Sequence, residues 1–271
     1  MTDYKKELAV AIEAAEKAGK YLVENSDRIS ISDYKGSTHD YATEQDLQSQ
    51  FSILKTIKDA FPEAKFLTEE NTEEVDTNDT LWIVDPIDGT RMFAHGIYFY
   101  SISIALWDKG EVKAGVVYAP QYGKNMYTAI KGGGAFVNDS KIVTSNKHDS
   151  LAQSLVATAF PYERDMVDAT MERMKLLIHR CEDIVRLGSC ALENVIVAEG
   201  GLGSYMERGP KVWDIAAAKL IIEETGGLCT NFDGTPLDIF GKKNGKYYLE
   251  FVSSKNRQIH EEVIELLSSL T

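Results

Sequence analysis

The sequence feature that most constrains the fold is an apolar run that ends in two closely spaced aspartates. Residues 81–84 read LWIV, which suits a buried strand, and Asp85 and Asp88 follow directly. Pro86 lies between the aspartates, where it can neither continue a helix nor donate a ladder hydrogen bond, so we expect the backbone to turn there. The pattern predicts two carboxylates at the carboxyl end of a strand, where α/β proteins build their sites.

The two residues after Asp88 indicate what these carboxylates could do. Gly89 permits a backbone conformation that is costly for other residues, and Thr90 can begin a helix whose free amides point back toward the carboxylates. Two anionic ligands that face a helix N-terminus can hold divalent cations and a phosphate together. The spacing alone fits a structural role, as a helix cap with a tight turn and no chemistry, as well as it fits a metal site, so both interpretations stay open at this point.

The hydrophobic pattern changes its period along the chain. Helical periodicity occurs over residues 5–23 and again at Leu47, Phe51, Leu54 and Ile57, which predicts two amphipathic helices. The middle of the chain alternates with period two and predicts an antiparallel meander, and the second half mixes short apolar runs with helical stretches. The predicted strands lie at 98–107, 112–119, 125–130, 155–159, 184–187, 202–206 and 247–252, the later helices at 163–180, 190–200, 213–225 and 256–268, and a loop or short hairpin at 30–39.

Together these elements predict an α/β fold in one unit. The chain has 271 residues, of which 44% are apolar, so it can bury a full core and is too apolar to be disordered. No stretch rich in Pro, Gly or Ser separates the halves. We therefore expect residues 1–271 to form a single unit of two closely packed halves, 1–150 and 151–271, with most of the candidate carboxylates in the first half.

Charge and cysteine content exclude several classes of function. The formal net charge of −13 repels phosphate backbones and anionic lipids, and no basic run sets a binding patch apart, so we expect neither a nucleic-acid nor a membrane partner. No apolar stretch is long enough to span a bilayer. Three cysteines without C-x-x-C spacing argue against a disulfide framework and a zinc site, and are typical of a cytoplasmic protein.

Further carboxylates lie near the ends of predicted elements. The pair Glu69-Glu70 follows an apolar run, Asp214 opens a predicted helix, and Asp46 completes a capping-box pattern that begins at Thr43. Taken singly, each has a structural explanation: a solvated loop carboxylate for the Glu pair, and a helix cap for each aspartate. The Glu pair lies 16 residues before Asp85, and the apolar run before it could deliver these carboxylates to the same sheet edge.

Taken as a set, these residues resemble the inositol monophosphatase family. The resemblance covers about residues 8–260 and includes the turn DPIDGT at residues 85–90 and the helix WDIAAAKLIIEETGG at residues 213–227. It also includes Lys35, Asp46, Glu69-Glu70, Gly132-Gly133-Gly134-Ala135-Phe136, Phe160-Pro161-Tyr162, Arg186-Leu187-Gly188-Ser189 and Glu207. The resemblance implies a layered αβαβα sandwich, usually a homodimer, that hydrolyses phosphate monoesters with Mg²⁺ and is inhibited by Li⁺.

The resemblance also implies roles for individual residues. Glu69, Asp85 and the carbonyl of Ile87 correspond to the ligands of one Mg²⁺, and Asp85, Asp88 and Asp214 to those of a second. A third ion would lie near Glu69 and, through water, Asp46. Glu69 and the Thr90 hydroxyl would orient the attacking water, with Asp46 beside them, whereas Glu70 and Lys35 would contact the ligands. All-oxygen ligands favour Mg²⁺, with Mn²⁺ as a substitute.

Substrate contacts follow from the same resemblance. The amides of Gly89 and Thr90 would hold the phosphate, and Glu207 and Asp214 would face the alcohol. Gly188-Ser189-Cys190 would line the same pocket, although Glu207 could also be a solvated loop carboxylate. Cys190 replaces a common Ala, and Arg91-Met92 replaces a small polar residue followed by Asn. The expected substrate is an inositol monophosphate; fructose 1,6-bisphosphate, 3′-phosphoadenosine 5′-phosphate and histidinol phosphate are the alternatives.

Other classes fit the sequence less well. The aspartyl-phosphate phosphatases use the pattern DxDx(T/V), and the spacing between Asp85 and Asp88 is one residue too long for it. No G-x-x-x-x-G-K-[ST] motif occurs, so a P-loop kinase is disfavoured. A non-catalytic binding module remains an alternative interpretation, because a phosphatase fold can be retained as a binding module.

Overall fold

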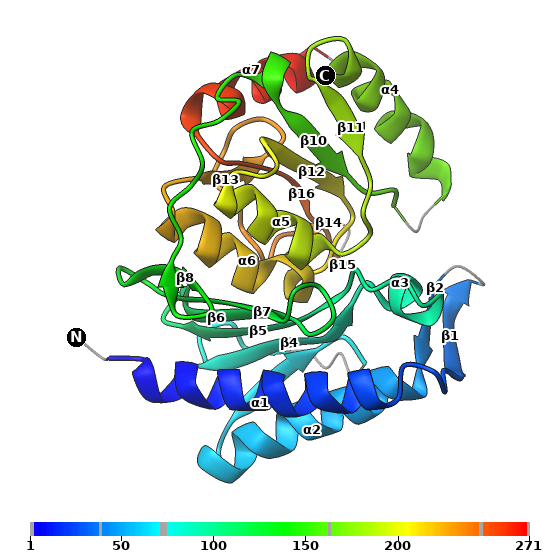
Figure 1. Ribbon diagram of the computed structural model, residues 1–271, viewed down its shortest axis with the longest axis vertical. Coiled ribbons are helices and arrows are strands. Elements are labelled where there is room, and N and C mark those ends of the chain that lie inside the picture. The colour runs from blue at the N-terminus through cyan, green and yellow to red at the C-terminus, as the bar shows by residue number, and fades with distance from the viewer. Residues whose placement is uncertain (1–2, 38–39, 71–74, 162–163, 244–245, 270–271) are drawn as a thin grey trace.

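Five layers of secondary structure alternate in the computed structural model, which describes residues 3–37, 40–70, 75–161, 164–243 and 246–269. From bottom to top in Figure 1, a pair of helices, a large sheet, a second helix pair, a smaller sheet and a last helix pair follow one another. The outer pairs are α1 (Lys5–Glu24) with α2 (Glu44–Ala60), and α4 (Val167–Ile178) with α7 (Arg257–Ser268). The middle pair is α5 (Cys190–Glu199) and α6 (Val212–Glu224). The predicted αβαβα sandwich is confirmed.

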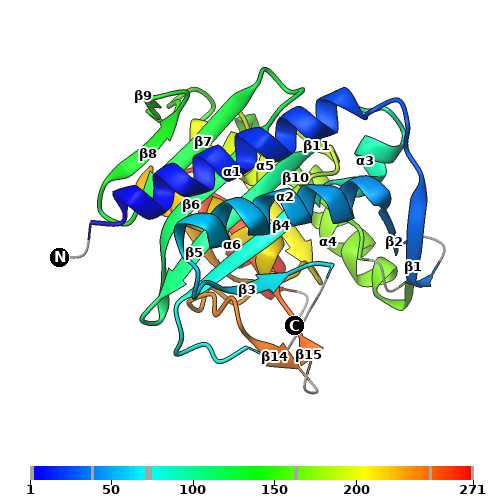
Figure 2. The same cartoon turned by 90° about the horizontal axis from the view of Figure 1, so that it is seen from below.

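The larger sheet has seven strands in the order β3-β4-β5-β6-β7-β8-β9. β3 pairs parallel with β4, and every later pair is antiparallel, so the predicted meander is confirmed. α1 and α2 lie side by side across one face of this sheet, as Figure 2 shows from below. The strands are β3 (Lys65–Thr68), β4 (Leu81–Asp88), β5 (Ser101–Asp108), β6 (Glu111–Ala119), β7 (Asn125–Ile130), β8 (Gly134–Val137) and β9 (Ser140–Lys141).

The smaller sheet has five strands in the order β11-β10-β12-β16-β13. β10 pairs parallel with β11 and β12, whereas β16 runs antiparallel to its neighbours. The sequence pattern did not predict β13. The remaining elements are β1 (Ile31–Ser37), β2 (Asp40–Thr43), α3 (Thr90–Ala94), β10 (Leu155–Thr158), β11 (Asp183–Val185), β12 (Ser204–Arg208), β13 (Leu228–Asn231), β14 (Lys242–Lys243), β15 (Lys246–Tyr247), β16 (Glu250–Ser254) and two 3-10 turns, Leu151–Gln153 and Arg164–Met166.

The turn expected at Pro86 is absent, because β4 continues to Asp88. The strand accommodates the proline with a bulge: Asp85 pairs with Ser103 and Asp88 with Ser101, so the register shifts between the two aspartates. The carbonyl of Pro86 accepts a hydrogen bond of 2.9 Å from the hydroxyl of Ser49 on α2. The bulge thus delivers both aspartates to one end of the sheet.

The predicted buried face of α2 is wrong in part. Leu47 and Phe51 were expected to face the core, but they are 39% and 66% exposed. The helix instead buries a face that carries Asp46 and Ser49 next to Ile53. Packing against the end of β4 explains this orientation of α2. Ser49 and Asp46 form hydrogen bonds with Pro86 and Thr90 there, which apolar side chains such as Leu47 and Phe51 could not form.

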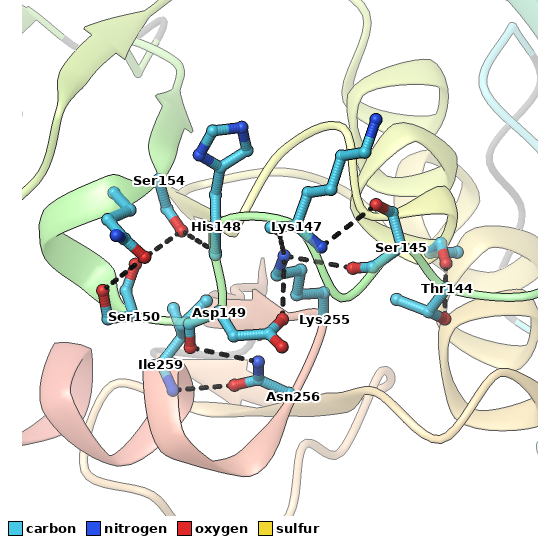
Figure 3. Close-up of polar contacts among 12 residues, drawn as sticks. Thr144, Ser145, Lys147, His148, Asp149, Ser150, Ser154, Lys255, Asn256 and Ile259 are labelled. Carbon is cyan, nitrogen blue, oxygen red and sulfur yellow. Dashed lines mark hydrogen bonds and ion pairs between the residues drawn. The ribbon is translucent and has the colours of Figure 1, made fainter.

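The segment that joins the two sheets, residues 143–150, is held by one buried lysine, Lys255 (Figure 3). Its ammonium donates hydrogen bonds to the carbonyls of Ser145, at 3.2 Å, and Lys147, and lies 3.3 Å from the carboxylate of Asp149. Lys255 directly follows β16, so these contacts hold the connecting segment, residues 143–150, against the smaller sheet. In the described part of the chain, no helix is both long and apolar enough to cross a membrane.

Candidate metal centre

Three aspartates that are far apart in the sequence converge where the large sheet meets the middle helix pair. Asp85 and Asp88 come from the end of β4, and Asp214 comes from the first turn of α6. One carboxylate oxygen of each lies within 4.8 Å of the other two. Asp85 and Asp88 are only 2% and 6% exposed, so the group is largely withdrawn from water.

Asp85 is held by the bulge of its own strand. Its Oδ1 accepts a hydrogen bond of 3.0 Å from the backbone N–H of Ile87. Burial raises the pKa of Asp85 well above its usual range, and the negative charges of Glu69, Asp88 and Asp214 raise it further. An Asp85 carboxylate in this place therefore needs a nearby cation to remain charged.

Asp88 lies against the N-terminus of α5. Its two oxygens accept hydrogen bonds from the backbone N–H groups of Cys190, at 3.1 Å, and Ala191, at 2.7 Å. The hydroxyls of Ser189 and Ser101 donate to the same carboxylate. Burial raises the pKa of Asp88 to about 6, although the hydrogen bonds from Ser189, Ala191 and Cys190 act in the opposite direction. Asp88 thus ties the first half of the chain to the second.

Asp214 is the third residue of α6 rather than its cap. The cap position is Lys211, whose backbone N–H donates a hydrogen bond of 2.8 Å to the Asp214 carboxylate. Burial raises the pKa of Asp214 well above its usual range, and the charges of Asp88 and Glu69 add to the effect. The backbone contact at the start of α6 involves one oxygen of Asp214, and the same carboxylate also lies within the acidic group.

Asp46 serves the backbone and the site at once. Its Oδ2 accepts hydrogen bonds from the N–H of Thr43, at 2.7 Å, and from the Thr43 hydroxyl, so the predicted capping box is confirmed. Its Oδ1 accepts a hydrogen bond of 2.9 Å from the hydroxyl of Thr90. The same hydroxyl lies 3.0 Å from the carbonyl of Ile87. Burial, with the charge of Glu69, raises the pKa of Asp46 to about 7.

Glu69 and Glu70 directly follow β3, the strand parallel to β4. The backbone N–H of Glu69 donates to the carbonyl of Val84 at 3.3 Å, which places its side chain beside the end of β4. The negative charge of Glu69 raises the pKa values of Asp46, Asp85 and Asp214 alike, so Glu69 lies near the three clustered aspartates. The backbone N–H of Glu70 donates to the side chain of Gln50 on α2, at 3.3 Å.

Two of the residues expected from the sequence lie outside what the structure describes. The backbone of Lys35 lies in β1, but its side chain is not among the described ones. Tyr162 of the Phe160-Pro161-Tyr162 motif falls within the undescribed residues 162–163. The geometry of the acidic group therefore rests on the other residues.

The segment Gly188-Ser189-Cys190 packs tightly against the end of β4. Gly188 and Gly89 both have positive φ, +107° and +95°. A Cβ on Gly89 would lie 3.1 Å from the carbonyl oxygen of Gly188, and a Cβ on Gly188 would lie 2.8 Å from Cγ of Met92. Side chains at either glycine would be strained and would push these segments apart. Met92, one of the two residues that differ from the family pattern, therefore packs directly against Gly188.

Glu207 is not a loop carboxylate, because it lies in β12. Its Oε2 accepts a hydrogen bond of 2.5 Å from the hydroxyl of Tyr205. Burial raises the pKa of Glu207 to about 7. Cys190 lies close enough for the Glu207 charge to act on its thiol, whose pKa burial already raises well above the usual range. The thiol therefore stays protonated at neutral pH, which disfavours a nucleophilic role.

Sequence reasoning missed Glu193. This residue is 0% exposed and lies inside α5, whose sequence CALENVIVAE is otherwise almost wholly apolar. Its carboxylate accepts hydrogen bonds from the backbone N–H groups of Leu187, at 3.0 Å, and Gly188, at 3.1 Å. Burial raises the pKa of Glu193 to about 8. The signal was available, since a glutamate on a buried helix needs partners nearby.

The donor set of this group fits a hard divalent cation. The three aspartates offer oxygen only, and burial without a cation would leave like charges within a few ångströms of one another. Asp85, Asp88 and Asp214 could hold a cation together, and Glu69 and the backbone of Ile87 lie nearby. A metal bound among them would offset the cost of burying these charges.

Comparisons with known proteins agree with this geometry. The sequence model of the inositol monophosphatase family matches residues 3–271. A protein named Nus factor SuhB from Pasteurella multocida is 38% identical over 84% of this chain and 85% of its own. A Thermotoga maritima protein named fructose-1,6-bisphosphatase/inositol-1-monophosphatase is 34% identical over 97% of this chain and 96% of its own.

Solved structures agree as well. A Thermotoga maritima IMPase superposes with a TM-score of 0.86 at 33% identity, covering 98% of both chains. A structure described as an IMPase/NADP phosphatase complexed with Mg²⁺ and phosphate gives a TM-score of 0.80 at 26% identity, covering 93% of this chain and 90% of the other. The fold and the acidic group define a protein of the metal-dependent phosphatase superfamily. The chain belongs to the inositol monophosphatase family.

Proposed function

We propose that this protein hydrolyses a phosphate monoester with Mg²⁺, with an inositol monophosphate as the preferred substrate. The observation that carries the proposal is the convergence of Asp85, Asp88 and Asp214, each with one oxygen within 4.8 Å of the others. Phosphate monoester hydrolysis is among the slowest uncatalysed reactions, so a site for it must neutralise charge on the transferring group and supply a strong nucleophile at neutral pH. Mg²⁺ bound at this place would supply both.

The proposed ligand sets use each carboxylate in its present place. Glu69, Asp85 and the Ile87 carbonyl would hold one ion, and Asp85, Asp88 and Asp214 a second. A third ion near Glu69 and Asp46 completes the proposal, and Mn²⁺ would substitute for Mg²⁺. Glu70 and Lys35 would support these ligands. The Thr90 hydroxyl has one proton, and its donation to Asp46 leaves the Ile87 carbonyl free.

Thr90 is the proposed orienting group for the attacking water, together with Glu69. When its proton points to Asp46, the Thr90 oxygen can accept a hydrogen bond from that water. Asp46 is itself fixed by Thr43, so the direction of the Thr90 hydroxyl is set by the helix cap of α2. The amides of Gly89 and Thr90 would bind the phosphate oxygens.

The alcohol of the substrate would lie between α5 and β12. Glu207 and Asp214 offer carboxylate oxygens there, and Cys190 presents a small apolar surface beside Glu207. The hydroxyl of Ser189 and the N–H of Cys190 already bind Asp88, so in this proposal Gly188, Ser189 and Cys190 shape the pocket more than they donate to the substrate. Carboxylate acceptors suit a polyol, which favours inositol or a similar sugar.

The family resemblance further supports a homodimer, and the three unpaired cysteines are compatible with a cytoplasmic location. A second candidate function is a binding role without catalysis. It is favoured by the curated relative named Nus factor SuhB. The two candidate functions differ in one measurable property: hydrolysis requires that the protein turns over a phosphate monoester, and a binding role does not.

The test is phosphate release by the purified protein with and without Mg²⁺. The panel contains myo-inositol 1-phosphate, fructose 1,6-bisphosphate, 3′-phosphoadenosine 5′-phosphate and histidinol phosphate. We expect metal-dependent turnover, fastest with myo-inositol 1-phosphate. Faster turnover of another compound would replace the substrate but keep the chemistry, whereas no turnover of any compound would favour the binding role.

A further inference from the structure

We propose that Glu193 is a positioning residue of the metal centre. Its buried carboxylate holds residues 187–188 in the place from which Ser189 and the first turn of α5 bind Asp88. The inference rests on the proposed function, because it concerns the same centre, but the contacts of the Glu193 carboxylate are with the backbone of residues 187–188. It acts through the loop and Asp88.

The contacts of Glu193 account for both of its oxygens. Oε1 accepts a hydrogen bond of 3.0 Å from the N–H of Leu187, and Oε2 accepts one of 3.1 Å from the N–H of Gly188. Both donors belong to the turn that leads into α5, and a buried backbone N–H without a partner costs about 1–3 kcal/mol. When Glu193 is ionised, its carboxylate can satisfy two adjacent N–H groups, because it then has acceptors only.

The turn that Glu193 holds makes two kinds of contact with the metal centre. The Gly188 carbonyl lies against Gly89, where a Cβ would approach to 3.1 Å. Directly after it, the Ser189 hydroxyl and the N–H groups of Cys190 and Ala191 donate to Asp88. A shift of the turn would therefore change the orientation of the Asp88 carboxylate and loosen its approach to Asp85 and Asp214.

The substitution Glu193→Gln tests this role with almost no change in volume. A glutamine side chain has one acceptor oxygen, and its NH₂ group would face one of the two backbone N–H groups. The turn must then move away from the side chain. Glu199→Gln is the matched control, because Glu199 lies on the same helix and bonds Tyr127 at 3.0 Å, away from the aspartates.

The measurement is Mn²⁺ binding to the purified full-length protein, followed by calorimetry or electron paramagnetic resonance. Mutation of residues that orient metal ligands without binding the metal themselves typically lowers metal affinity by about 10–100-fold. We therefore expect Glu193→Gln to weaken Mn²⁺ binding by about tenfold or more. Hydrogen exchange at the amides of Leu187 and Gly188 should also become faster. Glu199→Gln should leave Mn²⁺ binding and the exchange of both amides unchanged.

The turnover assay provides a second readout that a general loss of stability would not reproduce. At saturating Mg²⁺ we expect Glu193→Gln to keep most of its kcat, while the Mg²⁺ concentration for half-maximal rate rises in step with the Mn²⁺ dissociation constant. Circular dichroism and thermal unfolding report whether the variant is folded. If it is not, Glu193→Asp takes its place, with an expected effect between wild type and Gln.

The outcomes separate this inference from the proposed function. Wild-type protein that binds Mn²⁺ but releases no phosphate would overturn the proposed hydrolysis and leave the Glu193 comparison decisive. Folded Glu193→Gln, or folded Glu193→Asp where Gln does not fold, with wild-type Mn²⁺ affinity and unchanged exchange would overturn the inference. Wild-type protein that binds no Mn²⁺ would overturn both.

Discussion

The carboxylate of Asp88 accepts a hydrogen bond of 2.7 Å from the backbone N–H of Ala191, a residue 103 positions later in the chain. The first ends β4 of the large sheet and the second lies in the first turn of α5. The helix N-terminus favours a negative charge at this point, because its free N–H groups carry partial positive charge. The candidate metal centre is therefore assembled by packing between the halves rather than by either half alone.

Stability without metal should fall as pH rises. Burial raises the pKa of Asp88 to about 6 and that of Asp46 to about 7, whereas carboxyls in the unfolded chain titrate near 4. The folded state thus binds more protons, and this stabilisation is complete below about pH 4 and is lost as pH rises through 6 to 7.

Mg²⁺ should counteract that loss, because it binds the deprotonated carboxylates. We expect the rise in Tm caused by Mg²⁺ to be larger at about pH 8 than at about pH 5. Thermal unfolding with and without Mg²⁺ at both pH values measures it. A rise of equal size at the two pH values would contradict the expectation.

Cys190 should be dispensable for chemistry. Its contact with Asp88 uses the backbone N–H, which Cys190→Ala keeps, and its buried thiol is protonated at neutral pH. We expect Cys190→Ala to release phosphate within about threefold of the wild-type rate, and iodoacetamide to leave the wild type active. The steady-state rate of the variant measures this, and a loss of about 100-fold or more would point to a chemical role for the thiol.

Lys255 should contribute to stability but not to chemistry. Lys255→Met leaves the carbonyls of Ser145 and Lys147 without their donor, and breaking such buried contacts typically costs about 2–4 kcal/mol. Urea unfolding measures the loss. The control is Lys147→Met, whose side chain is exposed and should change the free energy of unfolding by less than about 0.5 kcal/mol. An equal change in the free energy of unfolding for the two variants would contradict the role of Lys255 in holding residues 143–150.

Lithium should inhibit hydrolysis if the family resemblance extends to the second proposed ion site. Li⁺ would occupy the place formed by Asp85, Asp88 and Asp214 with half the charge of Mg²⁺. We expect phosphate release to fall in tens of millimolar LiCl and to be unaffected by the same concentration of NaCl. Full activity in LiCl would count against that site.

Much of the fold could be predicted from local pattern. The helices of residues 5–23 and 190–200 and the meander through residue 130 have clear periods, and the structure contains them. The prediction failed where tertiary contacts decide: Leu47 and Phe51 look like a buried face, but the polar face of α2 satisfies groups at the end of β4. Likewise, Pro86 remains in a strand because a bulge accommodates it.

The candidate site was predictable as a set and not residue by residue. Asp46 and Asp214 each have a local explanation in their own helix, and only their convergence with Asp85 in space gives them a second meaning. Glu193 was missed because its partners, Leu187 and Gly188, are backbone groups without a side-chain signature. The sequence could show that Glu193 lies on an apolar helix but not which donors it meets.

The most direct test of the central claim is phosphate release by Asp88→Asn at saturating Mg²⁺, with circular dichroism as the control for folding. Asparagine keeps one acceptor for the start of α5 but loses the charge that would bind the second ion. We predict a folded protein whose rate with myo-inositol 1-phosphate is lower by about 100-fold or more, since loss of a metal ligand removes charge stabilisation of the transition state. A folded variant with the wild-type rate would contradict the proposed metal centre.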